Sequence, residues 1–248
     1  MYYEVAGSGH PLIMVHAGVA DNRMWDDQFE VFAEHYHVIR FDRRGFGQTK
    51  PVDGEFRRYE DIYALLKFLD IKQNYLMGCS MGGGACIDFA LEYPEMAEAL
   101  ITIGSGPADF QFDMPPLPIR DALIAAEIAG DLEKVNEYEA QLWLDGPNAP
   151  PGRVGGAVRE KMLSMNRIAL QNEKLELGTE VSPNPLAIKR LDELKLPTLI
   201  IYGDLDTPYI QAAGNTWHSI STAQKKLLCR ESLICPAWNN HKHSTSMF

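Results

Sequence analysis

The sequence predicts an α/β fold with a mostly parallel central sheet, helices on both of its faces and a helical insertion. Short apolar runs alternate with amphipathic segments along most of the chain. The runs are apolar along their whole length, which is typical of strands buried on both faces of a parallel sheet. Between residues 107 and 186 this alternation gives way to segments of helical pattern only.

Five apolar runs are predicted to be buried strands. They lie at residues 11–16, 37–42, 75–79, 99–104 and 197–203. Apolar residues with helical spacing fill the intervals between the first four runs, at residues 24–35, 58–70 and 81–94. In an open sheet of this kind the functional groups gather at the carboxyl ends of the strands.

The helical insertion predicts a cap. Residues 121–145 and 154–175 carry helical patterns on either side of the breaker-rich GPNAPPG. We therefore expect a core of residues 1–106 and 187–248, with an atypical tail over 217–248, and a cap of residues 107–186. A cap after a sheet strand is most simply a lid over an active site, although it could merely extend the fold. Trp143 and Met162 suit the roof of a substrate pocket, and either could be a core residue instead.

Composition excludes several classes of partner. The 248 residues are 46% hydrophobic and carry a formal net charge of −11, which opposes binding to nucleic acid or to an anionic membrane. No apolar run approaches the roughly 20 residues of a membrane span, and the N-terminus lacks a leader pattern, so we expect a cytoplasmic protein. The four cysteines lack C-x-x-C spacing and the histidines form no helical metal pair, so we expect no disulfide, metal or other cofactor.

The segment YLMGCSMGGGA places Ser80 between small residues at the predicted change from strand to helix. Gly78 and Gly82 allow close backbone approach at a sharp turn, which would project the serine hydroxyl above the sheet. A helix beginning near Met81 would direct N–H groups and its positive dipole end toward the same point. The pattern G-x-S-x-G therefore indicates a nucleophile elbow, or a glycine-rich turn that only joins strand to helix.

Several motifs in the right order give the chain a family resemblance. Four segments resemble motifs of the α/β-hydrolase superfamily, and the resemblance extends from residue 1 to about 215. The segments are LIMVHAG, FDRRGFGQT, GCSMGG and PTLIIYGDLDTP. The chain is most similar to its small-lid esterase and lactonase-like members. The resemblance implies a cofactor-free serine hydrolase of small carboxylic esters or lactones, acting through an acyl-enzyme.

The resemblance also implies residue roles. Ser80 is the expected nucleophile, and the backbone N–H groups of Gly18 and Met81 are the expected oxyanion donors. Of the two acids in GDLDTP, the family pattern favours Asp206 over Asp204. Asp42 is expected to hold its own turn, while Arg43 or Arg44 anchors neighbouring loops. Ala17 stands where the family usually has glycine, so its φ is expected to be negative.

The family's histidine motif is missing from the place where the resemblance predicts it, about 25 to 30 residues after the acid. His241 or His243 could replace it, although their segment is polar and terminal. A one-nucleotide slip is an alternative explanation. With allowed codons, reading LCRESLICPAWNNHKHSTSMF one base earlier yields MPGVAHLPSMEQPQAFNEYV, which contains the motif. We therefore expect residues 217–248 to be an out-of-frame tail.

Three functional alternatives remain open at this stage. The chain is a hydrolase of small esters or lactones, or a catalytically impaired relative that binds a ligand only. A cofactor-free relative with different chemistry, such as a C–C hydrolase or haloperoxidase, is the third, because the fold alone does not choose among these reactions. The expected partner is a small molecule, and the sequence leaves the oligomeric state open.

Overall fold

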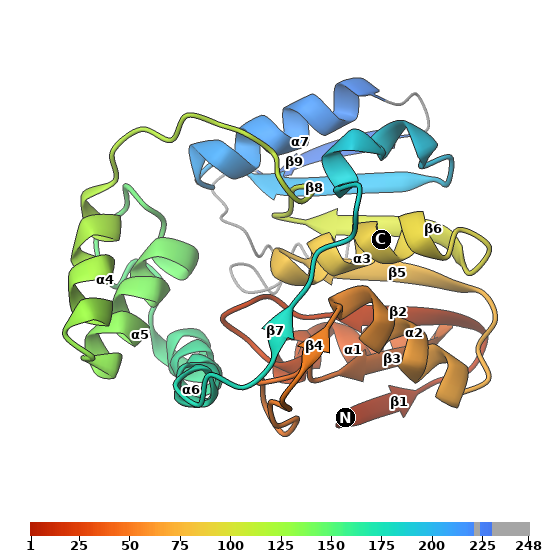
Figure 1. Ribbon diagram of the computed structural model, residues 1–248, viewed down its shortest axis with the longest axis horizontal. Helices are drawn as coiled ribbons and strands as arrows, with labels where there is room; N and C mark the ends of the chain where they lie inside the picture. Colours follow the sequence, from red (N-terminus) through yellow and green to blue (C-terminus); the bar gives the residue numbers. More distant parts are fainter. Residues whose placement is uncertain (221–223, 230–248) are drawn as a thin grey trace.

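The computed structural model describes residues 1–220 and 224–229. Within them, seven strands form one sheet in the order β1-β3-β2-β5-β6-β8-β9, in which β1 is antiparallel to β3 and every other pairing is parallel (Figure 1). The strands are β1 Tyr3–Ala6, β2 His10–Val15, β3 Tyr36–Phe41, β5 Asn74–Cys79, β6 Ala97–Ile103, β8 Thr198–Gly203 and β9 Gln224–Cys229.

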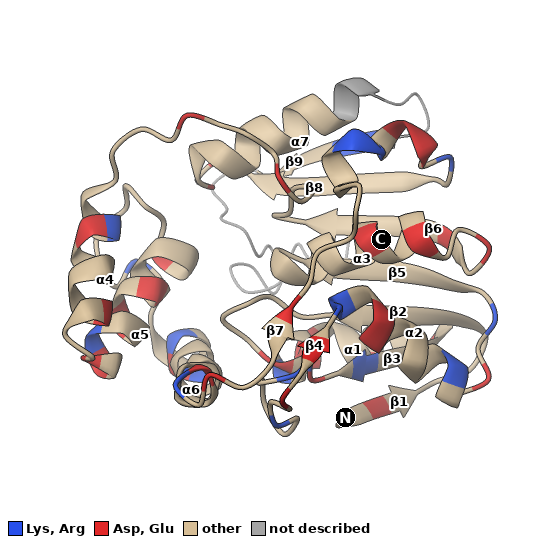
Figure 2. Ribbon diagram, viewed as in Figure 1, with Lys and Arg blue, Asp and Glu red and all other residues tan. Residues whose placement is uncertain are grey.

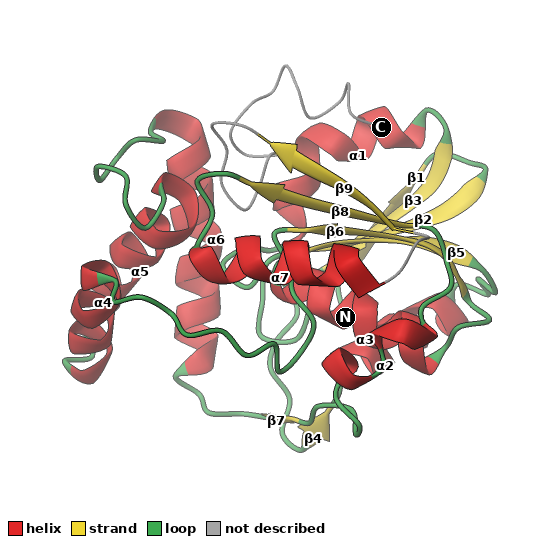
Figure 3. Ribbon diagram, turned by 90° about the horizontal axis from the view of Figure 1, so that it is seen from above, coloured by secondary structure: helices red, strands yellow, loops and turns green. Residues whose placement is uncertain are grey.

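Helices cover both faces of the sheet. They are α1 Asp26–Ala33, preceded by the 3₁₀ turn η1 Asn22–Trp25, and α2 Arg58–Phe68, α3 Met81–Glu92 and α7 Pro208–Ile220. Seen along the sheet, α1 lies on one side and α2, α3 and α7 lie on the other (Figure 3). Along β2, Ile13 and Val15 pack into the core on the α2–α3 side, while Leu12 and Met14 pack on the α1 side. Most of the length of the central strands carries no charge (Figure 2), as burial on both faces requires.

A separate helical layer lies beyond the carboxyl ends of β6 and β8 (Figure 1). It consists of α4 Pro118–Ile128, α5 Leu132–Ala140, the π-helical turn η2 Gln141–Asp145 and α6 Gly156–Glu173. Gly130 has a φ of 68°, and the Asp131 side chain accepts a hydrogen bond from the Lys134 N–H, so the stretch predicted as helical over 121–145 comprises two helices and the π turn. The layer has an apolar cluster of its own around Leu123, Val135 and Leu142.

Short elements return the chain from the helical layer to the sheet. β7 Thr179–Glu180 pairs in parallel with β4 Glu55–Phe56, and the 3₁₀ turns η3 Ala187–Lys189 and η4 Leu191–Glu193 precede β8. The small β4–β7 sheet fixes the end of the insertion beside α2 (Figure 1).

The predicted fold class is confirmed, and each predicted strand is found within two residues of its expected bounds. At the start of the predicted tail, Trp217 is fully buried in the core as part of α7, and β9 pairs in parallel with β8. Residues 221–223 and 230–248, including His241 and His243, lie outside the described residues. No helix in the part of the chain that the structure describes has both the length and the apolar character of a membrane span.

Candidate active site

Ser80 occupies the sharp turn between β5 and α3. Its φ of 50° and ψ of −117° lie in a region that residues other than glycine rarely adopt. The strain is held by hydrogen bonds on both sides: the Ser80 N–H donates to the Ile103 carbonyl at 2.8 Å, and the Gly84 N–H donates to the Ser80 carbonyl at 3.1 Å. The turn leaves the Ser80 side chain on the wall of two cavities.

The glycines around Ser80 are required by close backbone contacts. A Cβ on Gly82 would lie 2.4 Å from the Val15 carbonyl oxygen, and a Cβ on Gly78 would lie 2.5 Å from the Gly82 carbonyl oxygen. Real side chains essentially never approach backbone atoms so closely. The first turn of α3 therefore packs directly against the end of β2, which is where the predicted oxyanion loop begins.

The peptide between Ala17 and Gly18 is oriented by two buried donors. Its carbonyl accepts hydrogen bonds from His16 Nδ1 at 2.8 Å and from Arg43 Nη2 at 3.1 Å. Because a trans peptide holds C=O and N–H in opposite directions, the Gly18 N–H points away from His16 and Arg43. Gly18 and Met81 line the same cavity as Ser80.

His16 is a structural residue of this loop. The Arg43 N–H donates to His16 Nε2 at 3.0 Å, so the ring proton resides on Nδ1 and the ring is neutral. Burial and the nearby Arg43 guanidinium hold the pKa of His16 well below its ordinary value. Ala17 is not among the residues with positive φ, which agrees with the expectation that its methyl group needs a negative φ.

Asp206 follows β8 at the same edge of the sheet. Only 3% of its surface is exposed, and its carboxylate accepts long hydrogen bonds, both 3.3 Å, from the Gly203 and Thr207 N–H groups. The Thr207 hydroxyl caps α7 through the Ile210 N–H, and Pro208 occupies the first helical position. Burial raises the pKa of Asp206 to about 7. Asp204, the alternative acid, is exposed.

The predicted anchoring residues have defined contacts. Asp42 accepts hydrogen bonds from the Asn22 backbone N–H at 2.8 Å, the Asn22 side-chain amide at 2.6 Å and the Gln48 N–H at 2.7 Å. Arg44 binds Asp61 through both Nε and Nη2, at 2.7 to 3.0 Å. Asp42 thus holds its own turn, and Arg44 ties that turn to α2.

Two cavities of about 450 Å³ and 610 Å³ meet at Ser80. Three residues line both of them: Ser80, Glu139 and Trp143. The smaller cavity extends between the loop after β2, the turn after β3 and α6, and the larger one extends between α4, the π turn and α7. Trp143 lies on the π turn, an irregularity that is frequent at functional sites. The helical layer therefore supplies much of the wall opposite Ser80.

Met162 does not have the pocket position suggested by the sequence. It is fully buried in a cluster with Ala140 and Leu144 and lines neither cavity. Helical spacing places a methionine on an apolar face without telling whether that face meets a cavity or another helix. The suggestion that Met162 is a pocket residue was wrong.

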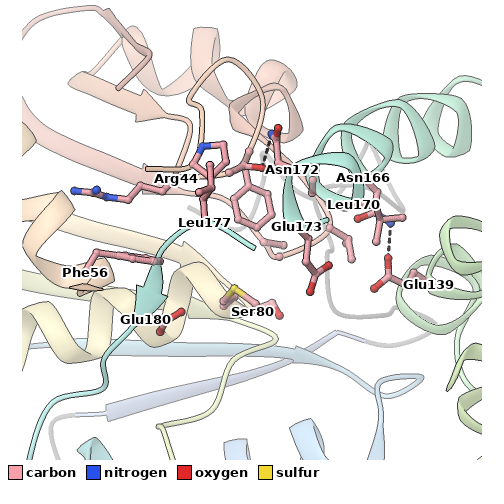
Figure 4. A pocket seen from close by; sticks show the side chains of 18 of the residues that line it. Arg44, Phe56, Ser80, Glu139, Asn166, Leu170, Asn172, Glu173, Leu177 and Glu180 are labelled. Carbon is pink, nitrogen blue, oxygen red and sulfur yellow. Dashed lines mark hydrogen bonds between the residues drawn. The ribbon is translucent and has the colours of Figure 1, made fainter. Parts of the chain in front are cut away.

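Carboxylates dominate the charge of the smaller cavity. Glu139, Glu173 and Glu180 line it, and Figure 4 shows Glu173 between Ser80 and Glu139 in that view. Glu180 is paired with Arg58 at 2.5 Å, and the lining cation Arg44 is paired with Asp61. Burial raises the pKa of Glu139 and the Glu173 carboxylate raises it further, while a 2.5 Å hydrogen bond from Asn166 Nδ2 lowers it.

The base of a catalytic triad is not among the histidines whose side chains the structure describes. These are His10, His16, His35 and His37, and none of them lines a cavity with Ser80. His241, offered by the sequence as a replacement for the missing base, lies outside the described residues. Over residues 1–220 and 224–229, no three His, Cys, Asp or Glu side chains are grouped so that they could hold a metal ion.

Sequence reasoning missed Glu139 as a cavity residue. Glu139 precedes Trp143 by four residues, so helical spacing places both on one face, and this spacing could have identified the pair. Arg43 was expected to anchor a neighbouring loop, and its partner is the peptide before Gly18, across 26 residues of sequence. No local pattern carries information about the partner in a contact of that kind.

Comparison with known proteins settles the family. Residues 10–225 match the sequence model described as alpha/beta hydrolase fold. The chain belongs to this family. Over 110 residues it is 32% identical to the 2-hydroxy-6-oxo-6-(2'-aminophenyl)hexa-2,4-dienoic acid hydrolase of Metapseudomonas resinovorans, a match that covers 42% of this chain but only 38% of that protein.

Two similarities extend over more of the chain. The 2-hydroxy-6-oxo-6-phenylhexa-2,4-dienoate hydrolase of Comamonas testosteroni is 24% identical over 217 residues, which cover 82% of this chain and 73% of that protein. The structure of MenH from S. aureus superposes with a TM-score of 0.75 at 22% identity, covering 99% of this chain and 95% of that one. The second similarity concerns the fold alone.

The packing at the elbow predicts opposite effects for two neighbouring glycines. Gly82→Ala should lower the free energy of unfolding by at least about 2 kcal/mol, because its methyl group would collide with the Val15 carbonyl. Gly84→Ala meets only the Gly106 carbonyl, at 3.9 Å, and should be neutral or stabilising by up to about 1 kcal/mol. Urea unfolding of both variants makes the comparison; equal effects would contradict the proposed contact.

The environment of Asp206 predicts a pH dependence of stability. Because its folded-state pKa of about 7 lies above the ordinary 3.8, the folded protein binds more protons than the unfolded chain between these values. The Asp206 contribution therefore makes stability fall as pH rises from about 4 to about 7. The stability of Asp206→Asn relative to the wild type should therefore be higher at pH 8 than at pH 5, as measured by urea unfolding. A difference independent of pH would mean that Asp206 has a cationic partner.

Proposed function

We propose that the chain is built as a serine hydrolase of small, uncharged carboxylic esters or lactones. The observation that carries this proposal is the position of Ser80, held at a strained strand-to-helix turn where two cavities meet. A hydroxyl that only joined two elements would not need this strain, and strained residues concentrate at functional sites.

In the proposed reaction the Ser80 oxygen attacks the acyl carbon while a base removes the hydroxyl proton. The oxyanion of the tetrahedral intermediate is bound by the Gly18 and Met81 N–H groups, each of which is worth about 2.7–4 kcal/mol in comparable sites. The alcohol leaves with the proton from the base, and water then attacks the acyl-enzyme to release the acid. Asp206 orients the base from the end of β8.

The base is the incomplete part of this proposal. A histidine must come from the segment after β9, either as His241 or His243 or as the histidine that the alternative reading frame would supply. The hydrogen bonds that Asp206 accepts from the described residues are long, and burial raises its pKa. Both observations support a histidine partner from outside the described residues, because an imidazolium would compensate the buried carboxylate. The rival function, a ligand-binding protein without turnover, follows if no histidine reaches Ser80.

The helical layer acts as a lid in this proposal. Its residues line both cavities, so it divides the space around Ser80 into two compartments. One compartment would hold the acyl part of an ester and the other the alcohol part. A roof over the site also limits the access of water and strengthens the electrostatic interactions at the oxyanion.

A second candidate function is hydrolysis of a dienoate at a C–C bond. Similarity to the two dienoic acid and dienoate hydrolases favours it. The charge of the smaller cavity opposes it, because Glu139 and Glu173 would repel a substrate carboxylate. We therefore place uncharged esters and lactones first.

Covalent labelling tests the nucleophile. A fluorophosphonate probe should label Ser80 slowly in the chain as written, and Ser80→Ala should not be labelled. Replacing the tail by the alternative reading frame should raise both labelling and turnover of short p-nitrophenyl esters by several orders of magnitude, because loss of a triad base costs up to about 10⁶ in turnover.

Two results would contradict this account of the base. Ordinary turnover by the chain as written, abolished in His241→Ala or His243→Ala, would place the base in the present tail. An unambiguous DNA sequence across codons 214–235, with no histidine motif in either other frame, would remove the reading-frame explanation.

Charge selectivity tests the substrate class separately from turnover. Glu139→Gln should tighten binding of a carboxylate-bearing ligand by about tenfold relative to its neutral analogue, since the repulsion between two carboxylates in one cavity is worth about 1–2 kcal/mol. Calorimetry with two unreactive amides, differing only in a terminal carboxylate or carboxamide, measures the ratio. Glu133→Gln is the matched control, because Glu133 lies on the same helix, pairs with Arg167 and lines neither cavity. An unchanged ratio in Glu139→Gln would contradict the assignment.

A further inference from the structure

A small cavity beside the elbow contains an excess of arginines. It measures about 50 Å³ and lies against Met81, Phe46 and Phe56. Three arginines and two carboxylates complete its wall: Arg43, Arg44, Arg58, Asp61 and Glu180. The ionised side chains of the wall therefore sum to one positive charge.

Two of these arginines are neutralised by the two carboxylates. Arg44 holds Asp61 through two nitrogens, and Arg58 Nη2 lies 2.5 Å from Glu180 Oε1. Arg43 has no carboxylate partner within residues 1–220 and 224–229. Its contacts are the Ala17 carbonyl at 3.1 Å and the ring of Phe46, whose centre lies 4.4 Å from its guanidinium carbon. The excess charge is therefore that of Arg43.

Arg43 is also the most deeply buried of the three, with 5% of its surface exposed. Its Nε is buried and has no hydrogen-bond acceptor among the described residues, and the same is true of Arg58 Nε. A buried cation without a counter-charge is strongly unfavourable, because neither the aromatic ring nor one carbonyl replaces its hydration. Burial and the Arg58 guanidinium lower the pKa of Arg43 to about 9, so it stays charged at neutral pH.

We propose that this cavity is a binding site for one small monovalent anion, chloride in ordinary buffers, held between Arg43 and Arg58. The charge of one negative unit follows from the single uncompensated arginine. The volume exceeds the roughly 10–15 Å³ that one water requires, so the cavity has room for a small ion. A divalent anion would leave an excess negative charge.

The anion would be connected to the candidate active site through two contacts. Arg43 Nη2 holds the Ala17 carbonyl and thereby the orientation of the Gly18 N–H, and Arg58 Nη1 donates to the Met81 carbonyl at 3.4 Å. A bound anion would keep both guanidinium groups in place. The site itself does not depend on whether Ser80 is a nucleophile.

The line width of the chloride NMR signal measures binding to the intact protein. It should broaden saturably as protein sites fill, and bromide should reverse the broadening while sulfate at equal ionic strength should not. The melting temperature should rise with chloride along the same saturation curve, because a ligand that binds only the folded state stabilises it. Neither measurement requires turnover, so the result is separate from the proposed function.

Two variants should change binding in opposite directions. Arg43→Met should abolish the saturable broadening, whereas Glu180→Gln raises the net charge of the wall and should tighten binding by about threefold to tenfold. Arg57→Met is the matched control, since Arg57 neighbours Arg58, pairs with Glu60 at the surface and does not line the cavity. Glu180→Gln keeps the test decisive if Arg43→Met does not fold.

Crystals soaked in sodium bromide should show one anomalous peak between Arg43 and Arg58. A cavity filled by water only, without an anomalous peak, would overturn the proposal. So would chloride broadening that is the same in Glu180→Gln, Arg57→Met and the wild type.

Discussion

The approach of α3 to β2 is the constraint on which the site depends. Gly82 lies so close to the Val15 and His16 carbonyls that no side chain could stand in its place. This contact fixes the first turn of α3 against the loop that follows β2. It thereby sets the positions of two peptide groups, those of Met81 and Gly18, that come from segments more than 60 residues apart. In the proposed reaction, donors held in this way would need no rearrangement when charge develops between them.

The orientation of the Gly18 peptide depends on a second, electrostatic layer. His16 contributes as a neutral donor because it is buried and lies near a cation, and Arg43 contributes as a cation that approaches the same carbonyl. Two buried groups of this kind are unfavourable unless each is satisfied. His16 is satisfied on both nitrogens, whereas Arg43 Nε has no hydrogen-bond partner among residues 1–220 and 224–229. The unsatisfied charge is thus located one contact away from a predicted oxyanion donor, where its compensation would affect the geometry of the site.

The sequence was sufficient for five strands of the sheet, for the elbow and for the helical layer, because each has a local pattern of apolar period or glycine spacing. Those five strands were found within two residues, and Ser80 was placed correctly at the strand-to-helix turn. The edge strand β1 was not predicted, and neither was β9, which lies in the segment expected to be an out-of-frame tail. The cavity walls could not be predicted in the same way. Trp143 lines both cavities and Met162 lines neither, although both lie on apolar faces of the same layer. The direction of a side chain depends on how helices pack, and the Arg43 contact depends on chain segments that only the fold brings together.

Asp206, at the end of β8, links stability to the proposed function. Asp206 is nearly completely buried, and its two hydrogen bonds are long, so its ionised form is poorly stabilised by the described residues. An imidazolium beside it would offset the burial of the carboxylate and would bring its pKa back toward the ordinary range. The same histidine would accept the Ser80 proton during acyl transfer. A tail that brings a histidine to Asp206 therefore both completes the proposed catalytic group and removes the penalty that the folded protein otherwise bears at neutral pH.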